Sequence, residues 1–443
     1  MKRMFTIFLV LVACLYAQSV CAQSETKITK LQWEELASMN TARMAHRIFP
    51  SGDNIVVVGG HTTGFDREQS AEIYKDGGWS YVTSPSYVHD NAGSVTLDDG
   101  RTLVFGGHNG DFGTGGGNSG IDIYNPATES FSDGGNMSVG RAMCVGVLAA
   151  GKVFITGDYW SSSSSRVVDV WEGGSQSTLE TSLSRSHEYP YLLPTSDGSS
   201  ILVVGNTGSY SGLSAVDKIN TATGEITQIT LDLLEEWQPM WPGEGADMPD
   251  FSIGGGRYVV LARSFNGYGD YGIILIDADA ETASLLVTIP KLILDETIDW
   301  GGYIIVNATA GEAYVLKSVK VNDESYNFYI ATVDYNAGAV TEIAYVTGFP
   351  VSGGYMGFAI LPDGRILGTG GSVTGESNFD ASNKVFAFTP NGGELISSIE
   401  NVTNPTTTTS AVYSLNGQQL PQMQRGVNII RQSDGTVKKV IVK

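Results

Sequence analysis

The histidines are the first candidates for chemistry in this sequence. The chain has 443 residues but only five histidines, which are His46, His61, His89, His108 and His187. An imidazole can act as a general acid or base near neutral pH and is a common metal ligand. Structural hydrogen bonding, ligand contact and metal binding therefore all remain open for these residues. We favour the structural interpretation and expect neither a metal nor a cofactor.

Aromatic rings beside carboxylates form the second group of candidates. The rings are Tyr159, Trp160, Trp237, Trp241 and Trp300. The carboxylates near them in the sequence are Glu235, Glu236, Glu244, Asp247, Asp250 and Asp299. Flat apolar rings can stack on the C–H faces of sugars, and carboxylates can bind the hydroxyl groups. This combination predicts a ligand-binding surface.

Acid–base chemistry and phosphate binding have less support. Glu188 or Glu244 could form an acid–base pair with Arg185, but no spacing singles out either carboxylate, so no catalytic residue is assigned. The glycine-rich stretch His108–Gly120 has no Lys-Ser/Thr pair and no helix after it. We therefore interpret this stretch as a loop and not as a phosphate cradle.

The composition excludes several classes of protein. With 42% hydrophobic and 16% charged residues, the chain is too apolar for a disordered protein. Its formal net charge of −21 argues against binding to nucleic acid or to an anionic membrane. The 55 glycines indicate many tight turns.

Residues 1–22 have the pattern of a secretory signal peptide. Lys2 and Arg3 form a charged start, Phe5–Cys14 is apolar, and small residues precede a cleavage site after Ala22. A lipoprotein-type cleavage before Cys14 is the alternative. The pattern predicts a protein that is secreted or held on the outer surface of a bacterial cell.

Removal of this leader changes the charge and the cysteine content. Loss of Lys2 and Arg3 takes the formal charge from −21 to −23. Cys144 is then the single remaining cysteine, so an internal disulfide cannot form. No other stretch approaches the ~18 apolar residues that cross a bilayer, so we expect no transmembrane span.

A repeated pattern of turn, apolar strand and glycine organises the rest of the chain. Four clear copies are PSGDNIVVVGG, LDDGRTLVFGG, AAGKVFITGD and LPDGRILGTGG, a fifth is SDGSSILVVGN, and two weaker ones are GGGRYVVLARS and AGEAYVLKSVK. They mark positions 60, 107, 157, 205, 262, 317 and 371, a spacing of 47 to 57 residues. Short strands in such units form small sheets that must pack face to face.

The repeat resembles the kelch repeat. After the glycines come the segments AEIYKDGGW, IDIYNPATESF, VVDVWEGG, VDKINTATGEI and ATVDYNAGAV, whose aromatic residues match the later Tyr and Trp of kelch repeats. The resemblance covers about Leu31–Pro390 and implies an all-β, seven-bladed kelch-type β-propeller, similar to the central domain of galactose oxidase, within residues 23–400. The double glycine is expected where a strand end packs on a neighbouring backbone.

The two ends of the propeller are expected to pair. Blade 7 supplies three inner strands, Gly357–Leu361, Ile366–Thr369 and Lys384–Phe388. The N-terminal segment LQWEELASM, with Trp33, resembles the missing outer strand, and this pairing would remove an exposed sheet edge. A competing outer strand is Glu394–Ile399.

The C-terminal residues form a separate segment. Residues 401–410 are a Thr-rich linker, and residues 411–443 contain three predicted short strands with Asn-Gly and Asp-Gly turns. This last segment carries a formal charge of +4 on an otherwise acidic chain. It resembles the sorting segment of proteins exported by the type IX secretion system. This resemblance implies that the secretion machinery of a bacterium is a partner. A small β appendage that packs on the propeller is the alternative.

The kelch resemblance also assigns the candidates to one face. Loops from an outer strand to the next inner strand, and from a second to a third strand, open on the same side, which we call the loop face. The five histidines and four tryptophans, Trp160, Trp237, Trp241 and Trp300, fall on this face. Alternatively, Leu231–Asp250 folds over the channel and buries its own rings.

Other residues match structural positions of the repeat. Arg43, Arg141 and Arg185 match the structural Arg or His that precedes the inner strand in kelch repeats. Trp33, Trp79 and Trp171 occupy strand positions and are expected in the core.

The kelch resemblance suggests several functions, and the residues that each one requires narrow the choice. A copper radical oxidase similar to galactose oxidase needs histidine ligands from later blades, but no histidine follows His187, so this activity is disfavoured. We predict a protein that binds a glycan or an extracellular protein through the loop face, and favour binding over catalysis. A sugar-modifying enzyme, mutarotase-like or epimerase-like, is the alternative.

Overall fold

The computed structural model describes most of the chain. The described residues are 26–109, 116–158, 163–205, 213–240, 251–264, 271–289, 303–322, 325–375, 380–395, 409–414, 419–420, 423, 426–432 and 437–442. Those up to Leu395 belong to one compact unit, and those from Thr409 onward belong to a second. In these ranges no helix is long and apolar enough to cross a membrane.

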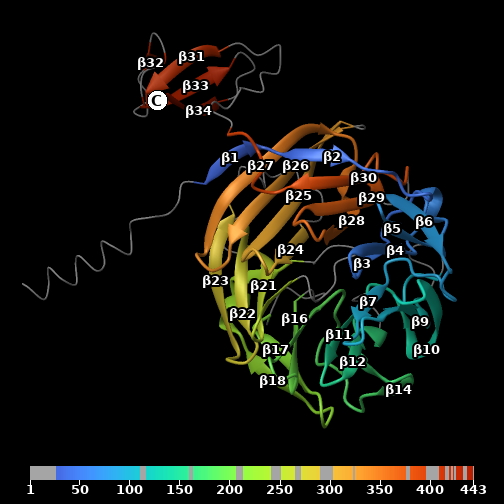
Figure 1. The fold of residues 1–443 in the computed structure, drawn as a ribbon. Coiled ribbons are helices and arrows are strands. Elements are labelled where there is room, and N and C mark those ends of the chain that lie inside the picture. The colour runs from blue at the N-terminus through green and yellow to red at the C-terminus, as the bar shows by residue number, and fades with distance from the viewer. Residues whose placement is uncertain are drawn as a thin grey trace, which may run out of the picture. The chain divides into compact units, whose positions relative to one another are not determined.

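Seven sheets surround a common axis in the first unit, which confirms the predicted seven-bladed β-propeller (Figure 1). Blade 1 has β3 (Arg47–Ser51), β4 (Asn54–Val58), β5 (Ala71–Lys75) and β6 (Gly78–Val82). Blade 2 has β7 (Gly93–Thr96), β8 (Thr102–Phe105), β9 (Asn118–Asn125) and β10 (Ser130–Arg141). Blade 3 has β11 (Val145–Ala149), β12 (Lys152–Thr156), β13 (Asp169–Glu172) and β14 (Ser175–Thr178). Blade 4 has β15 (Tyr191–Pro194), β16 (Ser200–Val204), β17 (Ala215–Asn220) and β18 (Ile226–Thr230).

The two weaker copies of the repeat lie in blades 5 and 6, and they form sheets like the others. Blade 5 has β19 (Trp237–Pro239), β20 (Ser252–Gly254), β21 (Arg257–Ser264), β22 (Tyr271–Asp277) and β23 (Thr282–Ile289). Blade 6 has β24 (Tyr303–Asn307), β25 (Glu312–Asn322), β26 (Ser325–Asp334), β27 (Ala339–Phe349) and β1 (Lys27–Lys30). Blade 7 has β28 (Ser352–Ile360), β29 (Ile366–Ser372), β30 (Val385–Thr389) and β2 (Gln32–Glu35). The short 3-10 helices are η1 (Thr63–Phe65), η2 (Ser163–Arg166) and η3 (Asp232–Glu235).

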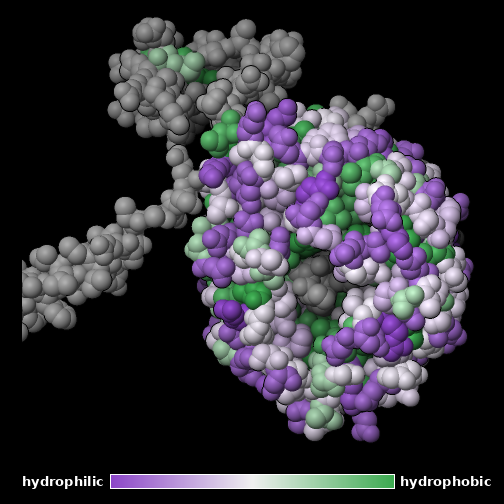
Figure 2. Space-filling model, in the orientation of Figure 1, coloured by the Kyte–Doolittle hydropathy of each residue, from purple (hydrophilic) through white to green (hydrophobic). Residues whose placement is uncertain are grey.

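The core lies between the blades. In β4 the run Ile55–Val58 is buried throughout, and so are β8 and β16, the equivalent second strands of blades 2 and 4. A strand covered on both faces needs apolar residues at consecutive positions, which explains why the repeat carries a continuous apolar run. On the outside of the propeller, hydrophilic residues cover much of the surface that Figure 2 shows.

The double glycines lie where the sequence analysis expects a close backbone approach. Gly59 and Gly60 follow β4 with φ of 71° and 81°. A Cβ atom on Gly59 would lie 2.1 Å from the His89 carbonyl oxygen, and one on Gly60 would lie 2.3 Å from the Met44 carbonyl oxygen. Neither distance is possible for a side chain, so this expectation is confirmed.

The ring is closed by the N-terminal strand β2, which pairs antiparallel with β30 and places Trp33 opposite Phe388. Trp33 contacts Phe349 and Phe386 edge to face, with ring centroids 5.3 and 5.6 Å apart. The side chain is nevertheless 36% exposed because β2 is the outermost strand, so its expected core position is wrong. Trp171 is buried as expected, and Trp79 is partly buried.

A second N-terminal strand extends the closure to blade 6. β1 pairs in parallel with β27, and Thr29 donates a hydrogen bond of 2.8 Å to the Glu342 carboxylate. The competing segment Glu394–Ile399 contributes one bridge, between Leu395 and Thr29. Its residues from 396 onward lie outside the described part of the chain.

The second unit contains four described strands, β31 (Thr409–Ser414), β32 (Gln419–Leu420), β33 (Gly426–Gln432) and β34 (Val437–Val442). They form one antiparallel sheet in the order β32-β31-β33-β34. Three strands are expected here from the sequence, and β32 is the additional one. Residues 401–408 of the linker fall outside the described residues.

Gly60 and Gly64 have similar positive φ, so comparing their alanine variants distinguishes the cost of backbone strain from the cost of steric crowding. We predict that Gly60→Ala lowers the free energy of unfolding by about 2 kcal/mol more than Gly64→Ala does, because only the former meets backbone atoms. Gly64 has φ of 80° with nothing within 4 Å of the added atom. Equal losses in denaturant titrations of the two variants would contradict this account of the double glycine.

Candidate functional site

A buried carboxylate on the third strand holds the loop face together in blades 1 to 4. The four carboxylates are Glu72 on β5, Asp122 on β9, Asp169 on β13 and Asp217 on β17. Each one accepts hydrogen bonds from one or two backbone N–H groups of the segment that leads into the first strand of its own blade. These four segments are residues 39–46, 86–92, 138–144 and 184–190, which we call the lead-in segments. These acids were not among the predicted site residues, although in three copies of the repeat the acid stands two residues before the aromatic residue.

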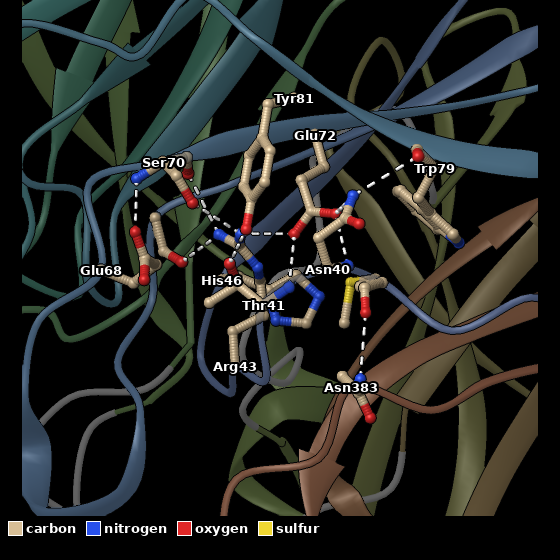
Figure 3. A network of polar contacts seen from close by, with 12 residues as sticks. Asn40, Thr41, Arg43, His46, Glu68, Ser70, Glu72, Trp79, Tyr81 and Asn383 are labelled. Carbon is tan, nitrogen blue, oxygen red and sulfur yellow. Dashed lines mark hydrogen bonds and ion pairs between the residues drawn. The ribbon is translucent and has the colours of Figure 1, made fainter.

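In blade 1 the carboxylate is bound by an arginine (Figure 3). The Arg43 guanidinium is fully buried and contacts Glu72 at 2.9 Å. It also donates to the carbonyl oxygens of Gly59 and Ser70, each at 3.0 Å. The second carboxylate oxygen of Glu72 accepts from the backbone N–H of Asn40 at 2.7 Å. These hydrogen bonds compensate for moving two charges out of water.

In blade 2 a histidine takes the same position. His89 Nδ1 lies 2.9 Å from the Gly106 carbonyl oxygen, and Nε2 lies 3.0 Å from the Asp122 carboxylate. Burial alone would raise the pKa of Asp122, but the hydrogen bonds from His89 and from the backbone N–H groups of Ser86 and Tyr87 lower it below its ordinary value. Both ring nitrogens of His89 face acceptors, so this imidazole replaces a guanidinium.

The same position, four residues before the first strand, is occupied by Arg141 in blade 3 and by His187 in blade 4. Arg141 binds Asp169, and its guanidinium also donates to the Val167 carbonyl oxygen at 2.8 Å. His187 stands at the same distance before its first strand and bonds through Nδ1 to the Gly205 carbonyl oxygen at 2.8 Å. The assignment of Arg185 to this position is therefore wrong, because it lies two residues too early.

The lead-in segments also bond to one another around the axis. Two residues before the first strand, Ala45, Asn91, Met143 and Tyr189 all have positive φ, between 45° and 55°. The backbone N–H of Asn91 donates to Ala45, that of Met143 to Asn91, and that of Tyr189 to Met143, at 2.9 to 3.1 Å. This chain of hydrogen bonds joins blades 1 to 4 on the loop face.

Three further residues of the loop face stand directly after the repeat glycines, and these are His61, His108 and Asp158. His61 Nδ1 lies 2.8 Å from the Asp90 carboxylate. The side chains of His61, His108, Asp158 and Asp90 are all buried. Burial lowers the pKa of His108, although Asp90 and Asp158 act in the opposite direction. The structure thus brings together two of the predicted candidates, His61 and His108, with two carboxylates that were not predicted.

His46 lies at the junction of blades 7 and 1. Its Nε2 is 2.8 Å from the Thr369 hydroxyl, which in turn donates to the Gly357 carbonyl oxygen at 3.3 Å. Burial, followed by the charges of Arg43 and Arg47, lowers its pKa well below the ordinary value of 6.5. His46 is therefore a neutral residue of the blade interface, which agrees with the structural interpretation.

A small cavity opens on the loop face between blades 4 and 5. Its lining includes two predicted candidates, Arg185 and His187, and four apolar side chains, Leu213, Ala215, Leu234 and Pro239. It has room for roughly one water-sized group. Burial lowers the pKa of His187 below its ordinary value, so the imidazole on this cavity is neutral.

Trp237 is the one predicted loop tryptophan that lies among the described residues. Trp237 lies in strand β19, opposite Ser264, and is buried, so its predicted position on an exposed loop is wrong. Its ring packs over Gly272, where a Cβ atom would lie 2.8 Å from it. Four other candidates, Tyr159, Trp160, Trp241 and Trp300, lie outside the described residues, as does Glu244.

Comparison with known proteins supports the fold alone. The sequence matches no family model, and no curated protein matches it significantly. Among solved structures, the chain is similar to a fungal alcohol oxidase of the AA5 family that was solved in complex with copper. The TM-score is 0.57 at 14% sequence identity, over 91% of this chain and 84% of that one.

The described residues do not form a copper site. Across the described ranges, no three side chains of the His, Cys, Asp or Glu type come together in a way that could hold a metal ion. The imidazoles of His46, His61, His89 and His187 are each hydrogen-bonded within the blades. Burial raises the pKa of the Cys144 thiol to about 12, so this group remains protonated.

The buried pair in blade 1 should be far more important for stability than an exposed pair. We predict that Arg43→Met lowers the free energy of unfolding by about 3–5 kcal/mol, because it leaves the buried Glu72 carboxylate without its cation. The control is Lys75→Met, which removes an exposed partner of Glu129 and should change stability little. Similar losses in the two variants would contradict the role of the buried pair.

Neutral buried histidines make the stability depend on pH. The folded pKa of His46 is below its unfolded value, so the unfolded chain binds more protons and stability falls as the pH drops below about 6.5. We predict a lower melting temperature at pH 5.5 than at pH 7.5, and a smaller difference in His46→Gln. One histidine contributes at most about 1.4 kcal/mol per pH unit. An unchanged difference in the variant would show that His46 is not buried as a neutral group.

Proposed function

We propose that this protein is a secreted or cell-surface propeller that binds a glycan through the loop face, at the junction of blades 4 and 5. The cavity at this junction carries the proposal. It combines the polar side chains of Arg185 and His187 with the apolar walls of Leu213, Leu234 and Pro239. Small-molecule sites typically have this mixture of apolar walls and a few placed polar groups.

A sugar fits this surface better than a fully apolar ligand. The cavity has room for roughly one water-sized group, so a single hydroxyl group of the sugar can enter it and lie near Arg185 and His187, while the rest of the sugar remains outside. The other ligand predicted from the sequence is an extracellular protein, which could present a polar side chain to the same cavity. The leader-like residues 1–22 and the similarity of the C-terminal segment to type IX sorting segments support the proposed export.

A sugar-modifying enzyme, mutarotase-like or epimerase-like, is the second candidate function. The hydrogen bond of 2.8 Å between His61 and Asp90, with His108 near both, favours it because such an arrangement can move protons. Conversion of a bound sugar, lost in Asp90→Asn while binding is retained, would favour this function over binding alone. The likeness to an oxidase does not bear on either choice, since it concerns the fold.

The binding proposal predicts a specific loss on the loop face. A glycan array followed by calorimetry with the best binder should detect binding to the wild type, and Arg185→Ala should weaken it at least tenfold. The control Arg101→Ala removes an arginine from a turn between the first and second strands of blade 2, on the opposite face, and should leave binding unchanged. Equal affinity of wild type and Arg185→Ala would exclude this junction as the binding site.

A further inference from the structure

Phe65 adopts an unusual backbone conformation on the loop face. It lies in the loop between β4 and β5, the second and third strands of blade 1, and its φ is 61°. Bulky residues rarely occupy this left-handed region, because the Cβ atom crowds the following carbonyl oxygen, and Gly or Asn usually takes such positions. Among the described residues, Phe65 and Tyr189 are the two aromatic residues with positive φ. Tyr189 is buried, whereas Phe65 is partly exposed.

Hydrogen bonds close the loop around Phe65. The backbone N–H and the hydroxyl of Thr62 both donate to the Asp66 carbonyl oxygen, at 2.7 and 3.1 Å. The Phe65 ring lies against the imidazole of His61, with the two ring centroids 5.1 Å apart. These contacts give the ring a fixed position beside the buried His61.

Packing alone does not explain why an aromatic residue occupies this position. Gly64, the preceding residue, has φ of 80°, and nothing lies within 4 Å of a Cβ atom added to it, so the loop is not crowded there. An asparagine or glycine at position 65 would close the same turn with less strain. Strained residues cluster at sites that bind or act on a ligand. The conformation of Phe65 therefore indicates a ring that is kept for contact with a ligand.

Blade 1 lies across the axis from the junction of blades 4 and 5. Three blades separate the two places in either direction around the ring, and both places are on the loop face. Because packed sheets are about 10 Å apart, positions three blades apart are separated by more than one sugar ring. A ligand that contacts both places must therefore contain several sugars.

We propose that the glycan is an oligosaccharide that crosses the axis on the loop face. One of its sugars places a hydroxyl group in the cavity beside Arg185 and His187, and another stacks on the Phe65 ring. This inference rests on the proposed function and names the class of glycan. Arg67, which is also partly exposed, carries five N–H donors for hydroxyl groups near the stacked sugar.

Oligosaccharide length tests this inference on the wild-type protein. The probes are the best-binding oligosaccharide of a glycan array and its fragments, shortened by one sugar at a time down to the methyl glycoside, with each affinity measured by calorimetry. The longest probe should bind at least tenfold more tightly than the methyl glycoside, because two contacts on one ligand reinforce each other. Equal affinities of all probes would contradict a ligand that crosses the axis.

Phe65→Asn identifies the second contact. The affinity for the longest probe should fall at least tenfold, while the affinity for the methyl glycoside, which binds at the junction, should stay unchanged. Asn tolerates positive φ, so the variant should fold, which its melting temperature checks. Phe65→Tyr keeps the ring and should bind like the wild type. The control Ala150→Asn changes a residue with φ of 49° in the turn between the first and second strands of blade 3, on the opposite face, and should leave all affinities unchanged.

The possible failures can be told apart. If Phe65→Asn binds every probe like the wild type, the ring only packs on His61 and the inference is wrong, while binding at the junction stands. If Phe65→Asn does not fold, Phe65→Leu takes its place, because it keeps an apolar contact with His61, and the same loss of affinity is expected. If the wild type binds no glycan, the inference and the glycan proposal both fail.

Discussion

The buried carboxylate on the third strand is the contact on which the loop face depends. Glu72, Asp122 and Asp169 each accept hydrogen bonds from at least one backbone N–H group and from a buried side chain of the lead-in segment, which fixes the path of that segment across the end of its blade. Two residues after His89 and after Arg141, at Asn91 and Met143, the backbone has positive φ and its N–H group donates a hydrogen bond to the lead-in segment of the preceding blade. The positions of the loop-face residues are thus determined from inside the blades, and the strength of a buried ion pair with additional hydrogen bonds makes them rigid.

Steric exclusion explains why the fold could be predicted from the sequence. Gly60 must adopt positive φ against the Met44 carbonyl oxygen, and no other residue can do so, which makes the glycine visible in copies that are otherwise dissimilar. The buried acids were harder to recognise, because their partner is Arg43 or Arg141 in two blades and His89 in another. That exchange conceals the common position, and Arg185, two residues from it in blade 4, then resembles the expected arginine.

The environment of Trp237 could not be predicted from local sequence. An aromatic residue among carboxylates resembles an exposed binding loop, but pairing with Ser264 makes it part of β19, and the absence of a side chain at Gly272 leaves room for its ring. Both partners come from later in the chain. The cavity beside blade 4 has a similar origin, because its lining combines Arg185 and His187 with Leu234 and Pro239 from later in the chain.

Closure of the ring by β1 and β2 has a consequence for the way in which the chain folds. The hydrogen bond between Thr29 and Glu342 joins residues 313 positions apart, and β2 pairs with β30 near the other end of the propeller. Contacts of such high sequence separation form slowly. Until blades 6 and 7 exist, β1 and β2 have no sheet to join, and until β1 and β2 arrive, the edges of β27 and β30 can pair with other chains. Assembly must therefore finish with residues that precede all seven blades in the sequence, and aggregation through the open edges of β27 and β30 is the hazard that this order of events creates.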